Sequence, residues 1–337
     1  MTISELNKQI EKSTISQCYL FYGEEDFLMR QKVEQIKKLV LIEGFDEFNL
    51  HVFDGKKFSI PEAKNVVESF PLMSEKKLII FKNTEVFKAA KGEVAEFFES
   101  ILPNLPSYTH IIVMESDIDK RKKGLLAAFD KAGGMIAFDY LKPPQLASWL
   151  ESLFDSAGKR ALTSDIAYMV SISSPSMATL KNEFDKIISY VGERENITRE
   201  DIDAVMAKSV EFKIFAMIDN IVAKKTDTVF ADLKEMKEGR EPATVAFSLI
   251  LSRLGEILMA KYLTNEGLNF NAIKSHFEPQ KQWLAGKTID LAKSFDADFL
   301  RDMLEYGCEL DYHTKIGKIN DYAAIEIFVV AITGKVC

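Results

Sequence analysis

The segment CYLFYGEEDFLMRQ, residues 18–31, decides the fold, because it reads as a buried strand that passes through one glycine into an amphipathic helix. The strand is CYLFYG, residues 18–23. The apolar face of the helix is formed by four residues at spacings of four, three and four: Met29, Val33, Ile36 and Val40. A strand that leads directly into a helix is the repeating unit of a parallel sheet covered by helices. We therefore expect an α/β domain at the start of the chain.

Further β-rich runs in the first 140 residues extend this pattern. The four runs are FNLHVF (48–53), KLIIF (77–81), HIIVM (110–114) and MIAFDY (135–140). Helical patterns lie between them, over residues 61–69, 93–102 and 120–132. The alternation predicts five parallel strands in one α/β domain, residues 1–142.

The rest of the chain has a helical pattern. Pro143 and Pro144 break the earlier alternation, and no strand-like run follows them. We predict a small helical domain over residues 143–208, in which Thr198 caps the last helix, and a second helical domain over residues 209–337. Its expected helices are 212–224, 226–238, 242–264, 279–293, 296–312 and 320–333. The stretch 244–263 is apolar on more than one face, which favours burial at a centre or a subunit interface.

Composition narrows the class of protein. With 337 residues, 47% of them hydrophobic and 28% charged, the chain can bury a substantial core and is expected to be a soluble multidomain protein. It has no run of 18 apolar residues, and its start resembles no export signal, so we expect no membrane partner. The net charge of -8 argues against wrapping nucleic acid by phosphate neutralisation, so a DNA role would be local or shared with partners.

Cysteine and histidine usage predicts no metal site and no cofactor. Cys18, Cys308 and Cys337 are far apart, and the four histidines lie in separate segments, so neither zinc spacing nor a disulfide framework can be drawn. A reducing cytoplasm fits this usage. No serine or cysteine nucleophile can be matched to a histidine by spacing. The acidic pairs Asp117/Asp119 and Glu24/Glu25 could be catalytic carboxylates, although surface positions account for them more simply.

The turn after the first strand is where a nucleotide-binding sheet would carry its phosphate loop. Such a loop needs G-x-x-x-x-G-K-[ST], so that backbone N–H groups and a lysine can surround the phosphates. Here Gly23 is followed by Glu24, Glu25 and Asp26, which would repel a phosphate, and Leu28 stands where the second glycine belongs. We predict that Gly23 only turns the chain, that the acids favour the helix N-terminus, and that the phosphate site is absent.

The second informative segment is SFPLMSEKKLIIF, residues 69–81, between a predicted helix and a predicted strand. Pro71 stops the helix, so Phe70, Leu72 and Met73 fall on a turn. One interpretation is that Leu72 and Met73 pack under the sheet. The other is a hydrophobic plug for a partner. Its charged rim would be Glu75, Lys76 and Lys77.

A basic run, DKRKKG, occupies residues 119–124. It places four cations at the start of a predicted helix: Lys120, Arg121, Lys122 and Lys123. Such a run is usually a solvated face, and the alternative is a contact with nucleic acid or a partner.

The order of these segments resembles the delta subunit of the bacterial DNA polymerase III clamp loader. The resemblance runs through YLFYGEEDFLMRQ, DEFNLHVFDG, FPLMSEKKLIIF, DKRKKGLLAAFDKAG, LKPPQLASWLES, LKNEFDKIISY, FKIFAMIDNI, GREPATVAFSLILSRLGEIL and ELDYHTKIGKINDYAAIEIFVVAI. No one of these motifs is diagnostic, but together and in this order they cover essentially the whole chain.

The resemblance implies an AAA+-like, RecA-type α/β domain without a working ATP site, a small helical lid and a helical collar that joins a five-membered loader ring. It implies that the chain binds and opens the beta sliding clamp for loading onto primed DNA, alongside the gamma/tau and delta-prime subunits. The clamp-binding pair falls on Leu72 and Met73. The family more often has an aromatic at the second position, so Met73 is a departure that would anchor less rigidly.

Three other functions stay open at this point. A delta-prime-like stator would also be inert toward ATP, but a cysteine-rich zinc site and an arginine finger would be expected, and neither is visible in the sequence. An active P-loop-type ATPase would require an unusual loop after Gly23. A DNA-binding regulator fits the acidic balance poorly.

Overall fold

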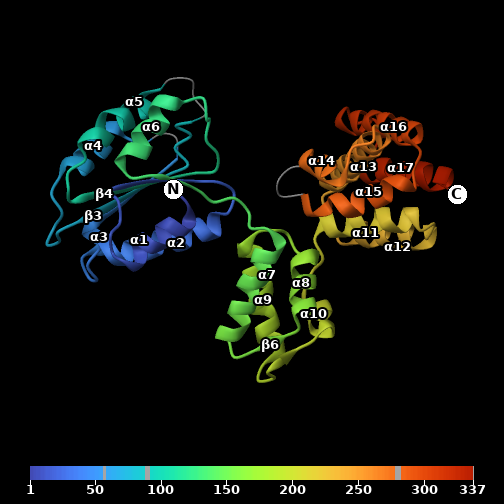
Figure 1. Cartoon of the computed structure of the whole chain (residues 1–337), viewed down its shortest axis with the longest axis horizontal. Helices are drawn as coiled ribbons and strands as arrows, with labels where there is room; N and C mark the ends of the chain where they lie inside the picture. The colour runs from blue at the N-terminus through green and yellow to red at the C-terminus, as the bar shows by residue number, and fades with distance from the viewer. Residues whose placement is uncertain (56–57, 88–91, 278–281, 337) are drawn as a thin grey trace. The chain divides into compact units, whose positions relative to one another are not determined.

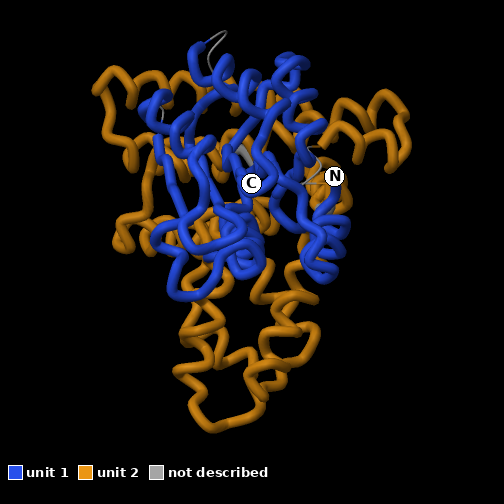
Figure 2. Tube along the Cα trace, turned by 90° about the vertical axis from the view of Figure 1, so that its left-hand side faces the viewer, with its two compact units in different colours: residues 1–141, 176–178 blue, residues 142–175, 179–337 orange. Residues whose placement is uncertain are grey.

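The structure is a computed structural model that describes residues 1–55, 58–87, 92–277 and 282–336 (Figure 1). The chain forms two compact units (Figure 2). Unit 1 contains residues 1–141 and 176–178, and unit 2 contains residues 142–175 and 179–337. The division into three domains stays a prediction.

Unit 1 is built on a parallel sheet with strand order β2-β3-β4-β1-β5. The strands are β1 (Cys18–Tyr22), β2 (Leu50–Asp54), β3 (Lys77–Lys82), β4 (Thr109–Glu115) and β5 (Met135–Ala137). All five predicted strands are present. The three central strands are buried along almost their whole length, which explains why they read as continuous apolar runs rather than as alternating ones.

Helices cover both faces of this sheet (Figure 1). One face carries α1 (Ile3–Glu11), α2 (Asp26–Val40) and α3 (Asp46–Asn49), and the other carries α4 (Ile60–Glu68), α5 (Glu93–Ile101), the 3-10 turn η1 (Leu102–Asn104) and α6 (Lys123–Ala132). The predicted apolar face of α2 is confirmed, since its four residues are buried. Neither α1 nor α3 was among the predicted helices. A capping box between Thr2 and Glu5 begins α1.

We predicted that a helix begins at Lys120, and this is wrong, because the helix begins later. The Asp119 carboxylate accepts the backbone N–H of Arg121 at 3.0 Å, and the Asp119 carbonyl accepts that of Lys122, also at 3.0 Å. These bonds form a turn, so α6 begins only at Lys123. Three of the four cations therefore precede the helix.

Unit 2 is helical, and its helices up to residue 205 are α7 (Pro143–Ser156), α8 (Thr163–Ile172), α9 (Met177–Val191) and α10 (Arg199–Val205). The first two residues of α9 belong to unit 1. Thr198 caps α10 as predicted, in a capping box with Asp201. The expectation that strands disappear after Lys142 is wrong, because β6 (Arg160–Ala161) and β7 (Asn196–Ile197) pair in parallel. Two-residue strands are too short to show any periodicity.

The remaining helices share one core. They are α11 (Val210–Val222), α12 (Thr226–Glu238), α13 (Ala243–Asn265), α14 (Phe270–Ser275), α15 (Ala285–Lys293), α16 (Ala297–Lys315) and α17 (Asp321–Val336), with a 3-10 turn, η2 (Gln282–Leu284), before α15. The short α14 was not predicted. The predicted helix 279–293 is described only from Gln282 onward, since residues 279–281 lie outside the described part of the chain.

The longest helix, α13, contacts α11, α15, α16 and α17. Ile250, Leu254 and Ile257 are among its buried residues, which agrees with the prediction of a central position. By length and composition α13 could cross a membrane, a test that buried core helices also pass, and 44% of its most apolar window is buried in the structure. The predicted class, a parallel α/β domain followed by helical parts, is confirmed.

Candidate partner-binding site

The connection between α4 and β3, residues 69–76, is here called the exposed loop. Phe70 is 81% exposed, Leu72 52% and Met73 76%. Three large apolar side chains within four residues are thus open to solvent. The interpretation that Leu72 and Met73 pack under the sheet is therefore wrong. Several exposed large apolar side chains so close together in the chain are typical of sites that bind a protein partner.

One buried side chain holds the middle of the exposed loop. Asn49, at the end of α3, is only 1% exposed. Its Nδ2 donates to the Leu72 carbonyl at 2.9 Å, and its Oδ1 accepts the Leu72 N–H at 2.8 Å. Both backbone polar groups of Leu72 are therefore satisfied by one amide. Asn49 was not among the predicted site residues, although a polar residue next to the apolar run of β2 was an available signal.

Lys77 anchors the start of the exposed loop. We expected Lys77 on a charged rim, and this is wrong, because it is 1% exposed. Its Nζ donates to the carbonyls of Val66 and Ser69 and, at 3.0 Å, to the Ser69 hydroxyl. These oxygens lie at the C-terminus of α4, where carbonyls lack helical partners and attract a cation. Burial lowers the pKa of Lys77 to about 8. Glu75 is exposed and Lys76 partly exposed, as a rim requires.

Tyr108 supports the same end of the loop. Its hydroxyl donates to the Glu68 carbonyl at 2.8 Å, and its ring lies 4.9 Å from the ring of Phe70, centroid to centroid. Met73 lies in the left-handed region, with φ at +51°. That conformation costs an L-residue on the order of 1 to 2 kcal/mol, so the surrounding anchors must impose it. The exposed loop is thus a held conformation that presents apolar side chains.

The turn after β1 shows why Gly23 is a glycine. Its φ is +130°, and a Cβ at this position would lie 2.4 Å from the Phe138 carbonyl oxygen. The N–H of Gly23 donates to the Glu115 carbonyl at 3.1 Å, and that of Glu25 donates to the Phe138 carbonyl at 2.8 Å. A phosphate loop needs such N–H groups free to point at the ligand. Here they are used within the protein.

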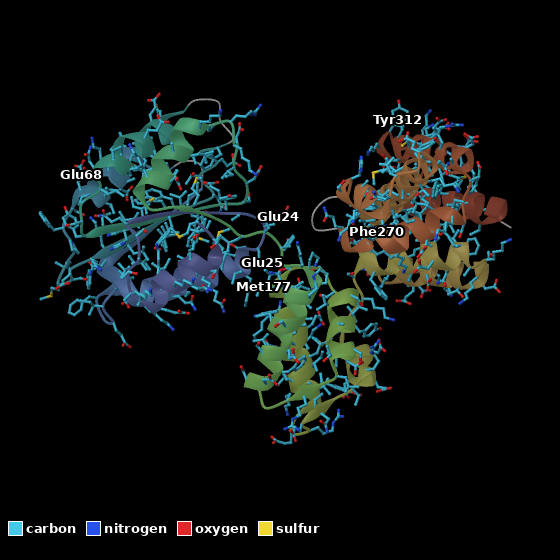
Figure 3. All side chains as sticks on the ribbon, viewed as in Figure 1. Glu24, Glu25, Glu68, Met177, Phe270 and Tyr312 are labelled. Carbon is cyan, nitrogen blue, oxygen red and sulfur yellow. The ribbon has the colours of Figure 1, made fainter. Side chains whose placement is uncertain are left out.

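Glu25 itself is buried, 1% exposed, whereas Glu24 and Asp26 are exposed. Its Oε2 accepts the N–H of Met177 at 3.0 Å, and the two residues lie together in Figure 3. Burial raises the pKa of the Glu25 carboxyl, against hydrogen bonds from backbone groups that lower it. The carboxylate is thus used to pair a backbone N–H group of the protein itself.

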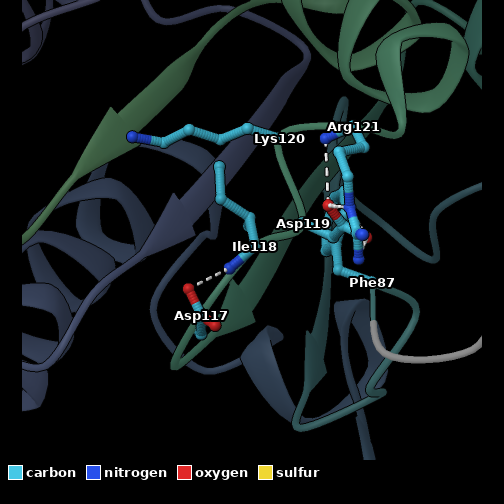
Figure 4. Close-up of a pocket in the computed structure, with 6 residues that line it drawn as sticks. All are labelled: Phe87, Asp117, Ile118, Asp119, Lys120 and Arg121. Atoms are coloured by element: carbon cyan, nitrogen blue, oxygen red, sulfur yellow. Dashed lines mark hydrogen bonds and ion pairs between the residues drawn. The ribbon is translucent and has the colours of Figure 1, made fainter.

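The basic run lines a pocket of about 380 Å³ after β4 (Figure 4). The lining residues are Phe87, Asp117, Ile118, Asp119, Lys120 and Arg121. Arg121 pairs with Asp119 through Nε and Nη2, both at 2.9 Å, and this pair lowers the pKa of the Asp119 carboxyl to about 2. The Lys122 Nζ donates to the Val86 carbonyl at 2.8 Å. Lys120 and Lys123 are exposed.

The predicted site residues therefore lie at two opposite edges of the sheet. In a parallel sheet all the carboxyl ends of the strands meet at one edge. Gly23 follows β1 and the basic run follows β4, so both lie at that edge. The exposed loop precedes β3 and Asn49 precedes β2, which places them at the amino edge. The structure brings the loop together with Asn49 and Tyr108, and not with the basic run.

Metal-binding groups are not found in the described part of the chain: no three His, Cys, Asp or Glu side chains gather there. Cys18 is buried and Cys308 exposed, both as free thiols. Cys337 lies outside the described residues.

Two family models match this chain. The model of DNA polymerase III, delta subunit, matches residues 19–138, and the model of the C-terminal domain of that subunit matches residues 211–332. The first match spans the α/β unit from β1 to the end of β5, and the second spans the helices from α11 to α17.

Two curated relatives resemble the chain over most of their length. DNA polymerase III subunit delta of Bacillus subtilis is 28% identical over 334 residues, which cover 96% of this chain and 94% of the relative. Probable DNA polymerase III subunit delta of Aquifex aeolicus is 22% identical over 263 residues, which cover 76% and 70%. The solved structure of the Bacillus subtilis DNA clamp loader delta protein (YqeN) matches with a TM-score of 0.64 and 25% identity, covering 98% of this chain and 99% of that one.

The fold and the exposed loop define the class: a parallel α/β module that presents exposed apolar side chains on one loop and is followed by helical parts. Within that class, the chain belongs to the family of delta subunits of the DNA polymerase III clamp loader. It is thus a component of the DNA polymerase III holoenzyme, and its process is DNA replication.

Proposed function

We propose that this chain binds the beta sliding clamp through the exposed loop and holds one clamp interface open, without hydrolysing nucleotide itself. The observation that carries the proposal is the anchored loop, in which Leu72 and Met73 are 52% and 76% exposed while Asn49 beneath them is buried. A side chain that is held in place but left in water gains apolar burial only when a partner covers it.

The energy of this contact sets the size of the surface required. Burying a Leu or Met side chain contributes roughly 1.5 to 3 kcal/mol, so Leu72 and Met73 contribute about 3 to 6 kcal/mol together. Association costs about 4 kcal/mol or more in lost freedom. The pair therefore cannot hold a clamp alone. Phe70, the adjoining helix α4 and the rim of Glu75 and Lys76 are the nearest surface for a larger contact.

Opening a closed ring requires a difference in affinity. A ligand that binds the closed and the open ring equally well shifts no equilibrium, however tightly it binds. The chain would shift the clamp toward its open form if the clamp surface that receives Leu72 and Met73 fits them better in the open ring.

The non-catalytic part of the proposal is supported at the other edge of the sheet. The N–H groups of Gly23 and Glu25 bond protein carbonyls, and the buried Glu25 carboxylate would repel a phosphate. We therefore assign ATP hydrolysis to the gamma/tau subunits. An active P-loop ATPase finds no support in this geometry.

Assembly with the other loader subunits, gamma/tau and delta-prime, is assigned to the collar, residues 209–337. Primed DNA would be contacted indirectly or within the assembled complex, and Lys120 and Lys123 are exposed cations that such a contact could use. The complex would work in the cytoplasm. A delta-prime-like stator is not favoured, since both family models and the Bacillus subtilis relative are those of the delta subunit.

The test is a titration of the full chain with the sliding clamp encoded by the same genome. We expect a one-to-one complex of chain with ring, and faster release of the clamp from a circular DNA when the chain is added without ATP. Absence of binding contradicts the proposal as a whole. Binding without faster release contradicts only ring opening.

A further inference from the structure

We propose that Asn49 is the positioning residue of the exposed loop, and that its side-chain amide fixes the backbone of Leu72 so that the loop meets its partner already ordered. This inference rests on the proposed function, since it concerns the same loop. The side chain itself does not reach solvent, so Asn49 would act without touching the clamp.

Both polar atoms of the Asn49 amide form hydrogen bonds with backbone groups. Nδ2 donates to the carbonyls of Phe45 and Leu72, at 2.9 Å each, and Oδ1 accepts the N–H of Leu72 at 2.8 Å. A flipped amide would set donor against donor and acceptor against acceptor, so the orientation is determined by these partners. The two bonds to Leu72, one to its carbonyl and one from its N–H, resemble the pair of hydrogen bonds that a residue forms with a neighbouring strand in a sheet.

Leu72 is the residue of the exposed loop at which such a pair of hydrogen bonds is needed. Pro71 before it has no N–H to donate, and Met73 after it stands at a strained positive φ. The Lys77 ammonium and Tyr108 hold only the end of the loop nearest to α4. Without Asn49, the backbone of Leu72 and Met73 would have no described hydrogen bond to the rest of unit 1.

A loop that is ordered before binding raises the affinity for its partner without adding any contact area. Each residue whose backbone becomes fixed only on binding costs conformational entropy that the contacts with the partner must offset. A loop that is already fixed avoids that cost, which is the general advantage of preorganisation. Ordering one residue at the moment of binding would weaken the complex by about tenfold, the factor that corresponds to 1.4 kcal/mol.

A purely architectural asparagine would behave differently from a positioning residue. The bond to Phe45 belongs to α3 and supports the fold, whereas the two bonds to Leu72 reach 23 positions along the chain into the exposed loop. Removing an architectural residue lowers the stability of the domain and leaves the affinity of the folded molecules unchanged. Removing a positioning residue lowers the affinity.

The experiment is a thermodynamic cycle on clamp affinity in the full chain. Asn49→Ala is measured in the wild-type background and in the Leu72→Ala/Met73→Ala background. We expect about tenfold weaker binding in the first and almost no further loss in the second, because an alanine pair has little to position. Equal losses in both backgrounds, or unchanged affinity of the folded Asn49→Ala chain, would overturn the inference.

Amide hydrogen exchange provides a readout on the loop itself. We expect a protected Leu72 N–H in the wild type and rapid exchange in Asn49→Ala. If Asn49→Ala does not fold, Asn49→Asp replaces it in the same cycle, since it keeps the shape and the acceptor for the Leu72 N–H and loses the donor to its carbonyl. An unprotected Leu72 N–H in the wild type contradicts the inference without any variant.

A matched control removes a similar bond from the other end of β2. The Asn83 amide donates to the Asp54 carboxylate at 3.0 Å, so Asp54→Ala breaks an asparagine bond far from the exposed loop. We expect unchanged clamp affinity for this variant. A wild-type chain that does not bind the clamp contradicts the proposed function, whereas wild-type binding with no effect of Asn49 contradicts only the present inference.

Discussion

The carboxylate of Glu25 accepts the backbone N–H of Met177 at 3.0 Å, although the two residues lie 152 positions apart. Both are buried, at 1% and 2% exposure. Glu25 stands in the turn where a phosphate loop would surround its ligand, and Met177 begins α9. The charge that makes the turn unsuitable for a phosphate therefore has a structural task, the pairing of an N–H group at a helix start.

The Glu25 carboxyl is expected to give the unfolding free energy a pH dependence. Burial raises its pKa above 4.5, so between 4.5 and the raised value the folded chain binds more protons than the unfolded chain. Stability from this group is therefore largest at low pH and falls as pH rises through that window. We expect the wild type to lose stability relative to Glu25→Gln as pH rises above 4.5, measured by urea unfolding. A difference that stays constant with pH contradicts this assignment.

The apolar pair of the exposed loop is expected to act on binding and not on stability. Leu72→Ala with Met73→Ala removes area that is buried only in a complex, so clamp affinity should fall by about 2 to 4 kcal/mol, at least tenfold. The melting temperature should barely move, because both side chains are exposed.

A matched control for this variant is Tyr312→Ala with Ile316→Ala, two exposed apolar residues of unit 2, at 60% and 45%. The control should bind the clamp normally. A loop variant that is destabilised yet binds the clamp as well as the wild type when folded would rule out the plug.

Lys77 is expected to couple the stability of unit 1 to alkaline pH. Its folded pKa is about 8 against 10.5 in the free side chain, so the unfolded chain binds more protons between these values. Stability from this group rises with pH across that window, by up to about 3 kcal/mol. Urea unfolding at pH 7.5, 9 and 10 should show the wild type gaining stability relative to Lys77→Met. A wild type that instead loses stability relative to the variant contradicts the burial of this ammonium.

Tight nucleotide binding is expected to be absent. Calorimetric titration of the chain with Mg·ATP should show no binding below the millimolar range, because the segment from Gly23 to Leu28 has no lysine and its N–H groups at Gly23 and Glu25 are already bonded. Tight, magnesium-dependent binding of ATP would contradict both the proposed function and our interpretation of the turn.

The collar is expected to mediate assembly. Residues 1–208 lack every helix of the C-terminal core, which begins with Ile214. This truncated chain should still bind the clamp through the exposed loop and fail to co-purify with the other loader subunits. Retained assembly would show that the assignment of the collar to residues 209–337 is wrong.

The sequence predicted the elements of the fold well and the surroundings of the site poorly. The apolar face of α2 and the five strands follow from local spacing, which a linear pattern records. The same pattern missed α1 and α14, and it extended α6 back to Lys120 because it could not show the turn at Asp119. For Lys77, residue type suggested an exposed rim, while the carbonyls of Val66 and Ser69 made burial possible.

The sequence by itself determined that an α/β domain with a poor phosphate loop is followed by helices, and that Phe70, Leu72 and Met73 stand next to a helix-stopping proline. Only the tertiary structure decided that these side chains face solvent, that Asn49 holds Leu72, and that Glu25 pairs with Met177. The physical reason is distance along the chain. Periodicity arises among neighbouring residues, whereas a hydrogen bond across 23 or 152 positions exists only after folding has brought its two ends together.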